Sequence, residues 1–237
     1  MGVLESIGPI DIPYFKMGNV DSTDLFCANE MAIFEFYLAN RARYRRVLDC
    51  GANIGVHSII MARCGWEVRA FEPDLIHLEQ LRHNLRINRV DVEVHASAIS
   101  LEDGYADFTR VLDNTTSSHL DGAKTPHGPT EIFKVRTEAA APHLAWADLA
   151  KIDIEGHEAA VITGVPFDIW ATTDTIVEVG SERNAALILF FFNNSLINLF
   201  SQKIKWRKVE KLEDMPISHR DGSLFITPKP TMPWGDK

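Results

Sequence analysis

The sequence predicts an α/β fold in which helices cover both faces of a mostly parallel sheet. Short apolar runs that suit buried strands alternate with segments of helical periodicity. The first run, 46–50, enters a glycine turn at Gly51 before a helical segment, and the second run, 67–71, ends at the acid Glu72. This pattern is typical of a βαβ unit with a crevice at the carboxyl ends of its strands, where such sheets bind nucleosides.

The expected elements follow the order of a doubly wound sheet. Residues 23–39 show near-helical apolar spacing, and we expect residues 1–45 to form an N-terminal helical extension or lid before the main domain, 46–237. Strands are expected at 46–50, 67–71, 92–96, 149–154 and 175–179, and helices at 56–63, at 75–88 and from about 156. The apolar segment 184–200 suits a buried helix, although its Phe190-Phe191-Phe192 run also suits a strand. Strands at 206–209 and 223–227 are expected to complete the sheet with an antiparallel edge.

Residues 103–137 interrupt this alternation. Ala106–Leu112 and Glu131–Thr137 alternate like strands, and a loop rich in Thr, Ser, His, Gly and Pro joins them. A long polar loop within a compact domain is usually functional or disordered. We therefore expect a flexible insertion at 103–137 that faces the substrate.

The composition limits the partners of the chain. A net charge of −9 over 237 residues argues against nucleic acid or an anionic membrane as the main partner. Three irregularly spaced cysteines suit neither a disulfide framework nor a zinc site. No apolar run approaches the roughly 18–20 residues that cross a bilayer, and the N-terminus lacks a signal-peptide pattern. We expect a soluble, cytoplasmic protein, and its oligomeric state is open.

The glycine pattern of the first turn indicates the kind of cofactor. A dinucleotide-binding turn reads G-x-G-x-x-G, but Asn53 and Val56 occupy the second and third glycine positions. The remaining D-x-G-x-N-x-G pattern at 49–55 suits a small cofactor without phosphates. S-adenosylmethionine fits, because its sulfonium and amino group suit the carboxylates of Asp49 and Glu72.

Glu72 is the expected ribose-binding acid. It comes 21 residues after Gly51, close to the spacing at which an acid accepts hydrogen bonds from ribose hydroxyls. Gly51 and Gly55 would let the backbone approach the ligand. In the alternative interpretation the two glycines only build a tight turn, and Glu72 caps the helix that opens at Pro73.

A second group of polar residues lies at 151–158. In a strand Lys151, Asp153 and Glu155 share one face, although a central parallel strand is normally apolar on both faces. The two acids could simply stabilise the N-terminus of the next helix. Three acids, a lysine and a histidine within eight residues favour an active-site wall instead. The candidate catalytic residues are Asp153, Glu155, Lys151, Glu158 and His157.

Three motifs make a resemblance specific. They read V-L-D-x-G-A-N-x-G at 47–55, A-F-E-P at 70–73 and K-x-D-x-E-G-x-E at 151–158. With them the chain resembles the FkbM family of S-adenosylmethionine-dependent methyltransferases over roughly residues 47–179. The resemblance implies a class I methyltransferase (Rossmann-like) fold: a seven-stranded, mostly parallel sheet in the order 3-2-1-4-5-7-6 with strand seven antiparallel.

The resemblance also implies O-methylation of a hydroxyl, typically on a sugar or a secondary metabolite. By analogy, Glu72 holds the ribose, and the adenine lies beside Ser97 and Ala98. Asp49, Gly51, Asn53 and Gly55 would line the methionine end, and Ala52, Pro73 and Asp153 complete the expected cofactor site. Where the family usually has a T-L-D segment before strand four, this chain has Arg136-Thr137-Glu138-Ala139.

The expected acceptor is a small-molecule or glycan hydroxyl, whose proton requires a base. We favour Asp153 near the methyl group, with Glu155 or Glu158 on the substrate; His157 is another possible base. A divalent cation on these acids and Glu178 is conceivable but not expected. Two alternatives stay open from the sequence: a nicotinamide-dependent oxidoreductase, and a cofactor-binding scaffold without catalysis.

Overall fold

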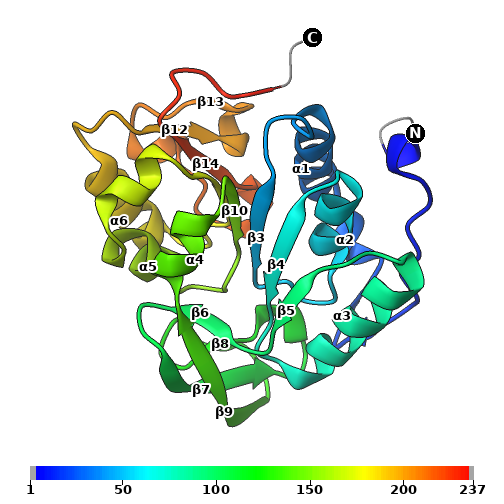
Figure 1. Cartoon of the computed structure of the whole chain (residues 1–237). Helices are drawn as coiled ribbons and strands as arrows, with labels where there is room; N and C mark the ends of the chain where they lie inside the picture. The colour runs from blue at the N-terminus through cyan, green and yellow to red at the C-terminus, as the bar shows by residue number, and fades with distance from the viewer. Residues whose placement is uncertain (1–3, 235–237) are drawn as a thin grey trace.

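The computed structural model describes residues 4–234, and its main element is an eight-stranded sheet (Figure 1). The strand order is β13-β12-β14-β11-β10-β3-β4-β5. In that order the bounds are Arg207–Lys208, Asn198–Ser201, Leu224–Thr227, Asp174–Val177, Leu149–Ile152, Arg46–Cys50, Glu67–Phe71 and Glu93–His95. Neighbouring strands from β11 to β5 are parallel, and β14 is antiparallel to both of its neighbours. The order 3-2-1-4-5-7-6 with an antiparallel seventh strand is therefore confirmed.

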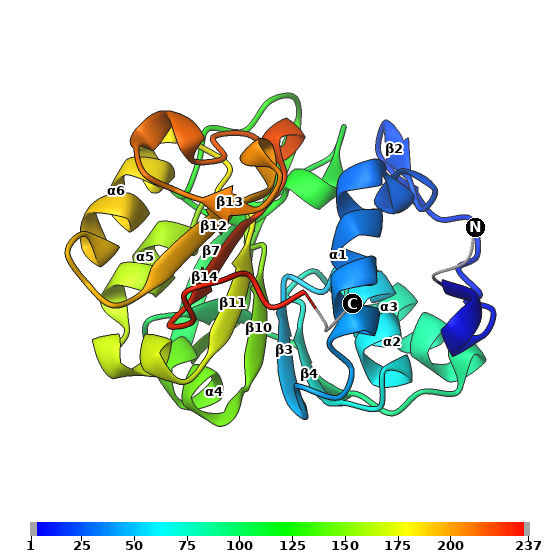
Figure 2. The same cartoon turned by 90° about the horizontal axis from the view of Figure 1, so that it is seen from above.

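Helices cover both faces of this sheet, as predicted (Figures 1 and 2). The helices on one face are α1, Ala28–Ala39, α2, Val56–Arg63, and α3, Leu75–Asn88. Those on the other face are α4, Ala140–Trp146, α5, Glu158–Gly164, and α6, Glu182–Phe192. Single 3₁₀ turns occur at η1 Leu4–Ile7, η2 Asp24–Phe26, η3 Thr115–Ser117, η4 Phe167–Ala171, η5 Gln202–Ile204, η6 Leu212–Asp214 and η7 His219–Asp221. No helix within residues 4–234 combines the length and apolar character of a membrane span.

The N-terminal segment packs into the core of the main sheet. After a short hairpin, β1 Lys16–Met17 and β2 Val20–Asp21, helix α1 buries Ile33, Phe34, Phe36 and Tyr37. These side chains join a cluster with residues of α2 and β3. These contacts fix α1 against α2 and β3, and they thereby also fix the position of the polar residues of α1.

Residues 98–139 form a second sheet of four strands below the main one in Figure 1. Its order is β6-β9-β7-β8, with bounds Ala98–Ser100, Thr130–Ala139, Gly104–Val111 and His119–Leu120. The predicted strands of the insertion are present as β7 and β9, which pair antiparallel. The connecting segment, expected to be a flexible loop, instead contains η3 and β8, because Asn114 and Ser118 hydrogen-bond its backbone.

The C-terminal part corrects two predictions. The expected helix 184–200 ends at Phe192, and its last residues form β12; the strand interpretation of 190–192 is wrong. The helix stops because Asn194 adopts a left-handed conformation (φ 59°) and the Ser195 hydroxyl donates to the Phe192 carbonyl at 2.7 Å. The expected strand 206–209 is the two-residue edge strand β13. Because β12 was not expected as a strand, the sheet has eight strands rather than seven.

Candidate cofactor and active site

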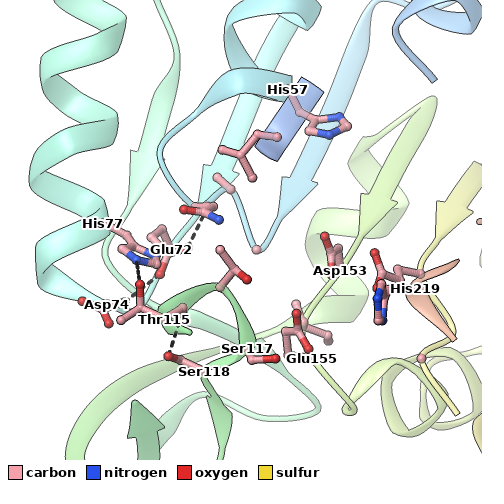
Figure 3. Close-up of a pocket in the computed structure, with 18 of the residues that line it drawn as sticks. His57, Glu72, Asp74, His77, Thr115, Ser117, Ser118, Asp153, Glu155 and His219 are labelled. Carbon is pink, nitrogen blue, oxygen red and sulfur yellow. Dashed lines mark hydrogen bonds between the residues drawn. The ribbon is translucent and has the colours of Figure 1, made fainter. Parts of the chain in front are cut away.

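A cavity of about 470 Å³ opens at the carboxyl ends of β3, β4, β10 and β11, a size typical of small-molecule sites (Figure 3). Its wall combines segments that are far apart in the sequence: 24–30, the turn 51–57, 71–77, the η3 region 114–118, 151–155 and 219–223. Part of the wall is apolar, with Phe71, Ile99 and Leu120, and part is acidic, with Asp153, Glu155 and Glu178.

The turn after β3 requires glycine at position 51. Gly51 has φ +80°, and a Cβ there would lie 1.8 Å from the backbone oxygen of Asp153. The missing side chain therefore lets the loops after β3 and β10 touch. The N–H groups of Gly51 and Ala52 both donate to the Phe71 carbonyl at 3.0 Å, which fixes the turn against the end of β4. The next residue, Asn53, has a buried side-chain oxygen without a hydrogen-bond partner among the described residues.

Glu72 lies on the opposite side of this turn. Its carboxylate accepts the backbone N–H groups of Asn53 and Asp74, each at 2.8 Å, and the residue is 5% exposed. Burial raises the pKa of Glu72 to about 8, with the charges of Asp74 and Asp49 adding to it and the two N–H donors opposing it. The position suits an acceptor for ligand hydroxyls.

Lys151 and two aspartates form an ionic cluster at the end of β10. The Nζ atom lies 3.1 Å from Oδ2 of Asp153 and 3.7 Å from Oδ1 of Asp49. Burial disfavours the ammonium, but the charges of Asp153 and Asp49 outweigh it and raise the pKa of Lys151. This shift favours the protonated form of Lys151, which pairs with the Asp153 carboxylate.

The acidic end of β10 faces the cavity beside the insertion (Figure 3). Asp153 and Glu155 line the wall, and the Glu155 carboxylate pairs with Lys124. Burial and the charge of Asp153 raise the pKa of Glu155 to about 7, against the opposing effect of Lys124. At the end of β11, burial and the same acids raise the pKa of Glu178 well above its usual value.

The predicted site residues divide into two groups. Those on the cavity wall are Gly51, Ala52, Asn53, Glu72, Pro73, Ala98, Lys151, Asp153 and Glu155. Those that do not line the cavity are Asp49, Gly55, Ser97, His157 and Glu158. Asp49 is fully buried and accepts the Ser58 hydroxyl at 2.6 Å, and Ser97 donates to Glu138 at 2.8 Å.

The other three residues of the second group also serve structural contacts. Glu158 accepts the backbone N–H groups of Ile154 and Gly156 at 2.9–3.0 Å, so it holds the loop after β10. His157 lies 3.4 Å from the Ser100 hydroxyl, and burial lowers its pKa. Gly55 faces α3, since a Cβ there would lie 3.2 Å from Leu81.

Several wall residues were missed by the sequence analysis. Glu30, His57, Lys124 and His219 come from segments without a recognised motif. The hydroxyl-rich stretch 115–118 was the available signal for the insertion, and it does lie on the wall. Arg110 anchors that insertion, because its guanidinium binds both oxygens of the buried Asp74 at 2.6 and 2.7 Å.

The comparison with family models matches residues 49–195 to the Methyltransferase FkbM domain. This match covers more than half of the chain and includes all the strand ends that form the cavity. The chain therefore belongs to the FkbM methyltransferase family, and it is an S-adenosylmethionine-dependent methyltransferase. No curated protein matches its sequence.

The comparison with solved structures includes the following three chains. Cofactor-bound Rv0187 from MTB is 16% identical, with a TM-score of 0.44 over 83% of this chain and 79% of that chain. The O-methyltransferase from Bacillus cereus in complex with SAH is 14% identical, with a TM-score of 0.46 and coverages of 88% and 86%. The T. thermophilus 16S rRNA N2 G1207 methyltransferase RsmC, in complex with AdoMet and guanosine, is 16% identical, with a TM-score of 0.46 and coverages of 91% and 45%.

The cavity residues fit S-adenosylmethionine. The apolar part of the wall suits a base, Glu72 suits the ribose hydroxyls, and the unpartnered amide oxygen of Asn53 offers a further acceptor. Family membership sets aside the nicotinamide alternative. Among residues 4–234, no three His, Cys, Asp or Glu side chains are grouped as a metal site would need.

Proposed function

We propose that this methyltransferase acts on a hydroxyl of a small molecule or glycan, such as a sugar or a secondary metabolite, with Asp153 as the base. One observation carries the proposal: Asp153 and Glu155 face the same cavity as Glu72. An acceptor hydroxyl bound in this cavity would therefore meet these carboxylates. The proposed cofactor contacts are Gly51, Ala52, Asn53, Glu72, Pro73 and Ala98.

The chain's own residues would position the acceptor and take its proton. S-adenosylmethionine supplies, when bound, a methyl group activated by a sulfonium, so catalysis depends largely on holding the nucleophile in line. Lys151 lies 3.1 Å from the Asp153 carboxylate and would hold it in place at the end of β10. Glu155, with a pKa of about 7, would bind the acceptor hydroxyl or share its proton near neutral pH.

The rest of the wall supports a polyhydroxyl acceptor. The stretch 115–118 presents threonine and serine side chains, and Lys124 and His219 add polar groups nearby. Hydroxyls and carboxylates are suitable partners for a sugar, whereas this acidic wall would repel a nucleic-acid phosphate. We further propose that the N-terminal segment expected at 1–45, of which the structure describes 4–45, forms the extension beside the cofactor, and that the insertion 103–137 recognises the acceptor.

A methyl-transfer assay tests the acceptor class. The chain is incubated with S-adenosylmethionine labelled in its methyl group and with pools of sugars, hydroxylated aromatic compounds, RNA or peptides. We expect label in a hydroxyl compound that resists alkali, because methyl ethers survive treatment that hydrolyses methyl esters. Label found only in RNA, in peptides or in alkali-labile products would contradict the proposal.

The substitution Asp153→Asn tests the base. We expect turnover to fall by about 10²–10⁴-fold, the usual contribution of a positioned base, while binding of S-adenosylhomocysteine is retained. The control is Asp168→Asn, which changes an exposed acid at η4 away from the wall and should leave both quantities unchanged. Full turnover of the Asp153 variant would eliminate this residue as a required base.

A further inference from the structure

The carboxylate expected to bind the amino group of the cofactor, that of Asp49, does not reach the cavity. Asp49 is 0% exposed and does not line the cavity. Its Oδ2 accepts the Ser58 hydroxyl, and its buried Oδ1, which has no hydrogen-bond partner among the described residues, lies 3.7 Å from the Lys151 ammonium. A cationic amino group in the cavity therefore needs a carboxylate from elsewhere on the wall.

Glu30 offers such a carboxylate. It lies in the first turn of α1 and lines the cavity, and its side chain is 24% exposed. One oxygen, Oε2, lies 2.8 Å from Nε2 of His57, which follows directly after the glycine turn. No hydrogen bond within the described residues uses the other oxygen, Oε1. Glu30 is therefore fixed through one oxygen and available through the other.

A buried chain of groups orients Glu30. The Tyr37 hydroxyl lies 3.0 Å from Nδ1 of His57, and Tyr37 is 0% exposed. Because the Glu30 carboxylate can only accept, we assign the proton of the neutral histidine ring to Nε2, which donates it to Glu30. Nδ1 then accepts the Tyr37 hydroxyl. The ring of His57 also packs edge-on against Phe34 at 4.9 Å, which limits its rotation.

The charges on the wall favour an anionic Glu30 that lacks a lysine of its own. Burial alone would raise the pKa of Glu30, but the hydrogen bond from His57 and the charge of Lys151 lower it. Both lysines that line the cavity are paired with other acids, Lys151 with Asp153 and Lys124 with Glu155. A ligand cation would complete the charge balance at Glu30.

We propose that Glu30 binds the positively charged amino group of the cofactor's amino-acid end, and that Tyr37 and His57 position it. The inference rests on the proposed cofactor site. In the close-up His57 lies apart from Glu72, the proposed ribose acceptor, rather than beside it (Figure 3). The N-terminal segment then supplies part of the cofactor site itself rather than only a cover.

Two ligands separate this role from a structural one. S-adenosylhomocysteine carries the amino-acid end, whereas 5′-methylthioadenosine keeps the adenosine and the sulfur but lacks it. In calorimetric titrations, Glu30→Gln should weaken the binding of S-adenosylhomocysteine by about 10- to 100-fold, the effect of losing a hydrogen bond between charged groups. The binding of 5′-methylthioadenosine should weaken by less than about 3-fold. Tyr37→Phe should also reduce the affinity for S-adenosylhomocysteine relative to that for 5′-methylthioadenosine, by a smaller factor.

The controls make each outcome decisive. Glu35→Gln, an exposed residue on the same helix, should change neither affinity. A measurement without any variant uses the deaminated analogue of S-adenosylhomocysteine, which should bind the unmodified chain about 10- to 100-fold more weakly than the parent compound. The inference would be overturned if Glu30→Gln weakened the binding of both ligands equally. It would also be overturned if the unmodified chain bound the deaminated analogue as tightly as S-adenosylhomocysteine. Failure of the unmodified chain to bind S-adenosylhomocysteine would overturn the proposed function as well.

Discussion

Replacing Gly51 with alanine tests the contact on which the site geometry depends. Gly51 joins β3 to the turn that faces the cavity, and its Cα approaches the Asp153 carbonyl of the neighbouring loop. An added Cβ would lie 1.8 Å from that oxygen, whereas real Cβ atoms essentially never approach closer than 3.0 Å. The two loops must therefore separate by about 1.2 Å, and Asp153 moves with its own loop.

The cost has two parts that can be separated. Alanine in the left-handed conformation of Gly51 (φ +80°) costs about 1–2 kcal/mol, and forcing atoms into a packed contact costs about 1–3 kcal/mol more. The matched control is Gly65→Ala. Gly65 has φ +87° but nothing within 4 Å of the added Cβ, so this variant carries only the conformational cost.

Urea unfolding and calorimetry supply the measurements. We expect Gly51→Ala to lower the free energy of unfolding by about 2–5 kcal/mol and Gly65→Ala by about 1–2 kcal/mol. Only the first variant should lose affinity for S-adenosylhomocysteine, because only it displaces the loops around the cavity. Equal destabilisation by the two substitutions, with binding retained in both, would refute this reasoning.

Two further predictions concern buried charges. Because the pKa of Glu72 is about 8 in the folded chain and about 4.5 when unfolded, its stabilising contribution is complete below pH 4.5 and is lost as pH rises towards 8. Relative to Glu72→Gln, the free energy of unfolding should therefore fall by up to about 1.4 kcal/mol per pH unit between pH 5 and 8; identical pH profiles in urea unfolding would contradict this. Arg110→Met leaves Asp74 buried without its cation, so unfolding measurements should show a loss of about 3–5 kcal/mol. The control Lys134→Met removes an exposed pair with Asp107 and should cost less than about 0.5 kcal/mol; similar losses in the two variants would argue against the role of Arg110.

The central part of the fold could be predicted from the sequence because its signals are local. The strands β3 and β4 were expected at 46–50 and 67–71 and are found there, since each is a short apolar run that ends at a glycine or an acid. The segment 184–200 carried a signal for its division. Asn193-Asn194-Ser195 interrupts the apolar run directly after Phe192, and such polar residues mark a turn. The apolar residues on either side do not by themselves distinguish a buried helix from a buried strand.

The site was predictable only where one motif supplies neighbouring wall residues. Gly51, Glu72 and Asp153 follow directly from strand ends, and all three line the cavity. Within the same motifs, Asp49 and Glu158 could not be told from wall residues, because their burial depends on partners contributed by the fold. Glu30 lies in a segment without a motif, and it reaches the cavity only because α1 packs against α2.

The crystal structure of the complex with S-adenosylhomocysteine tests most directly whether this cavity holds the methyl donor. We expect the ribose hydroxyls within hydrogen-bonding distance of the Glu72 carboxylate, and the sulfur facing the side of the cavity that carries Asp153. A ligand bound elsewhere on the chain, with the cavity between Glu72 and Asp153 empty, would contradict the account.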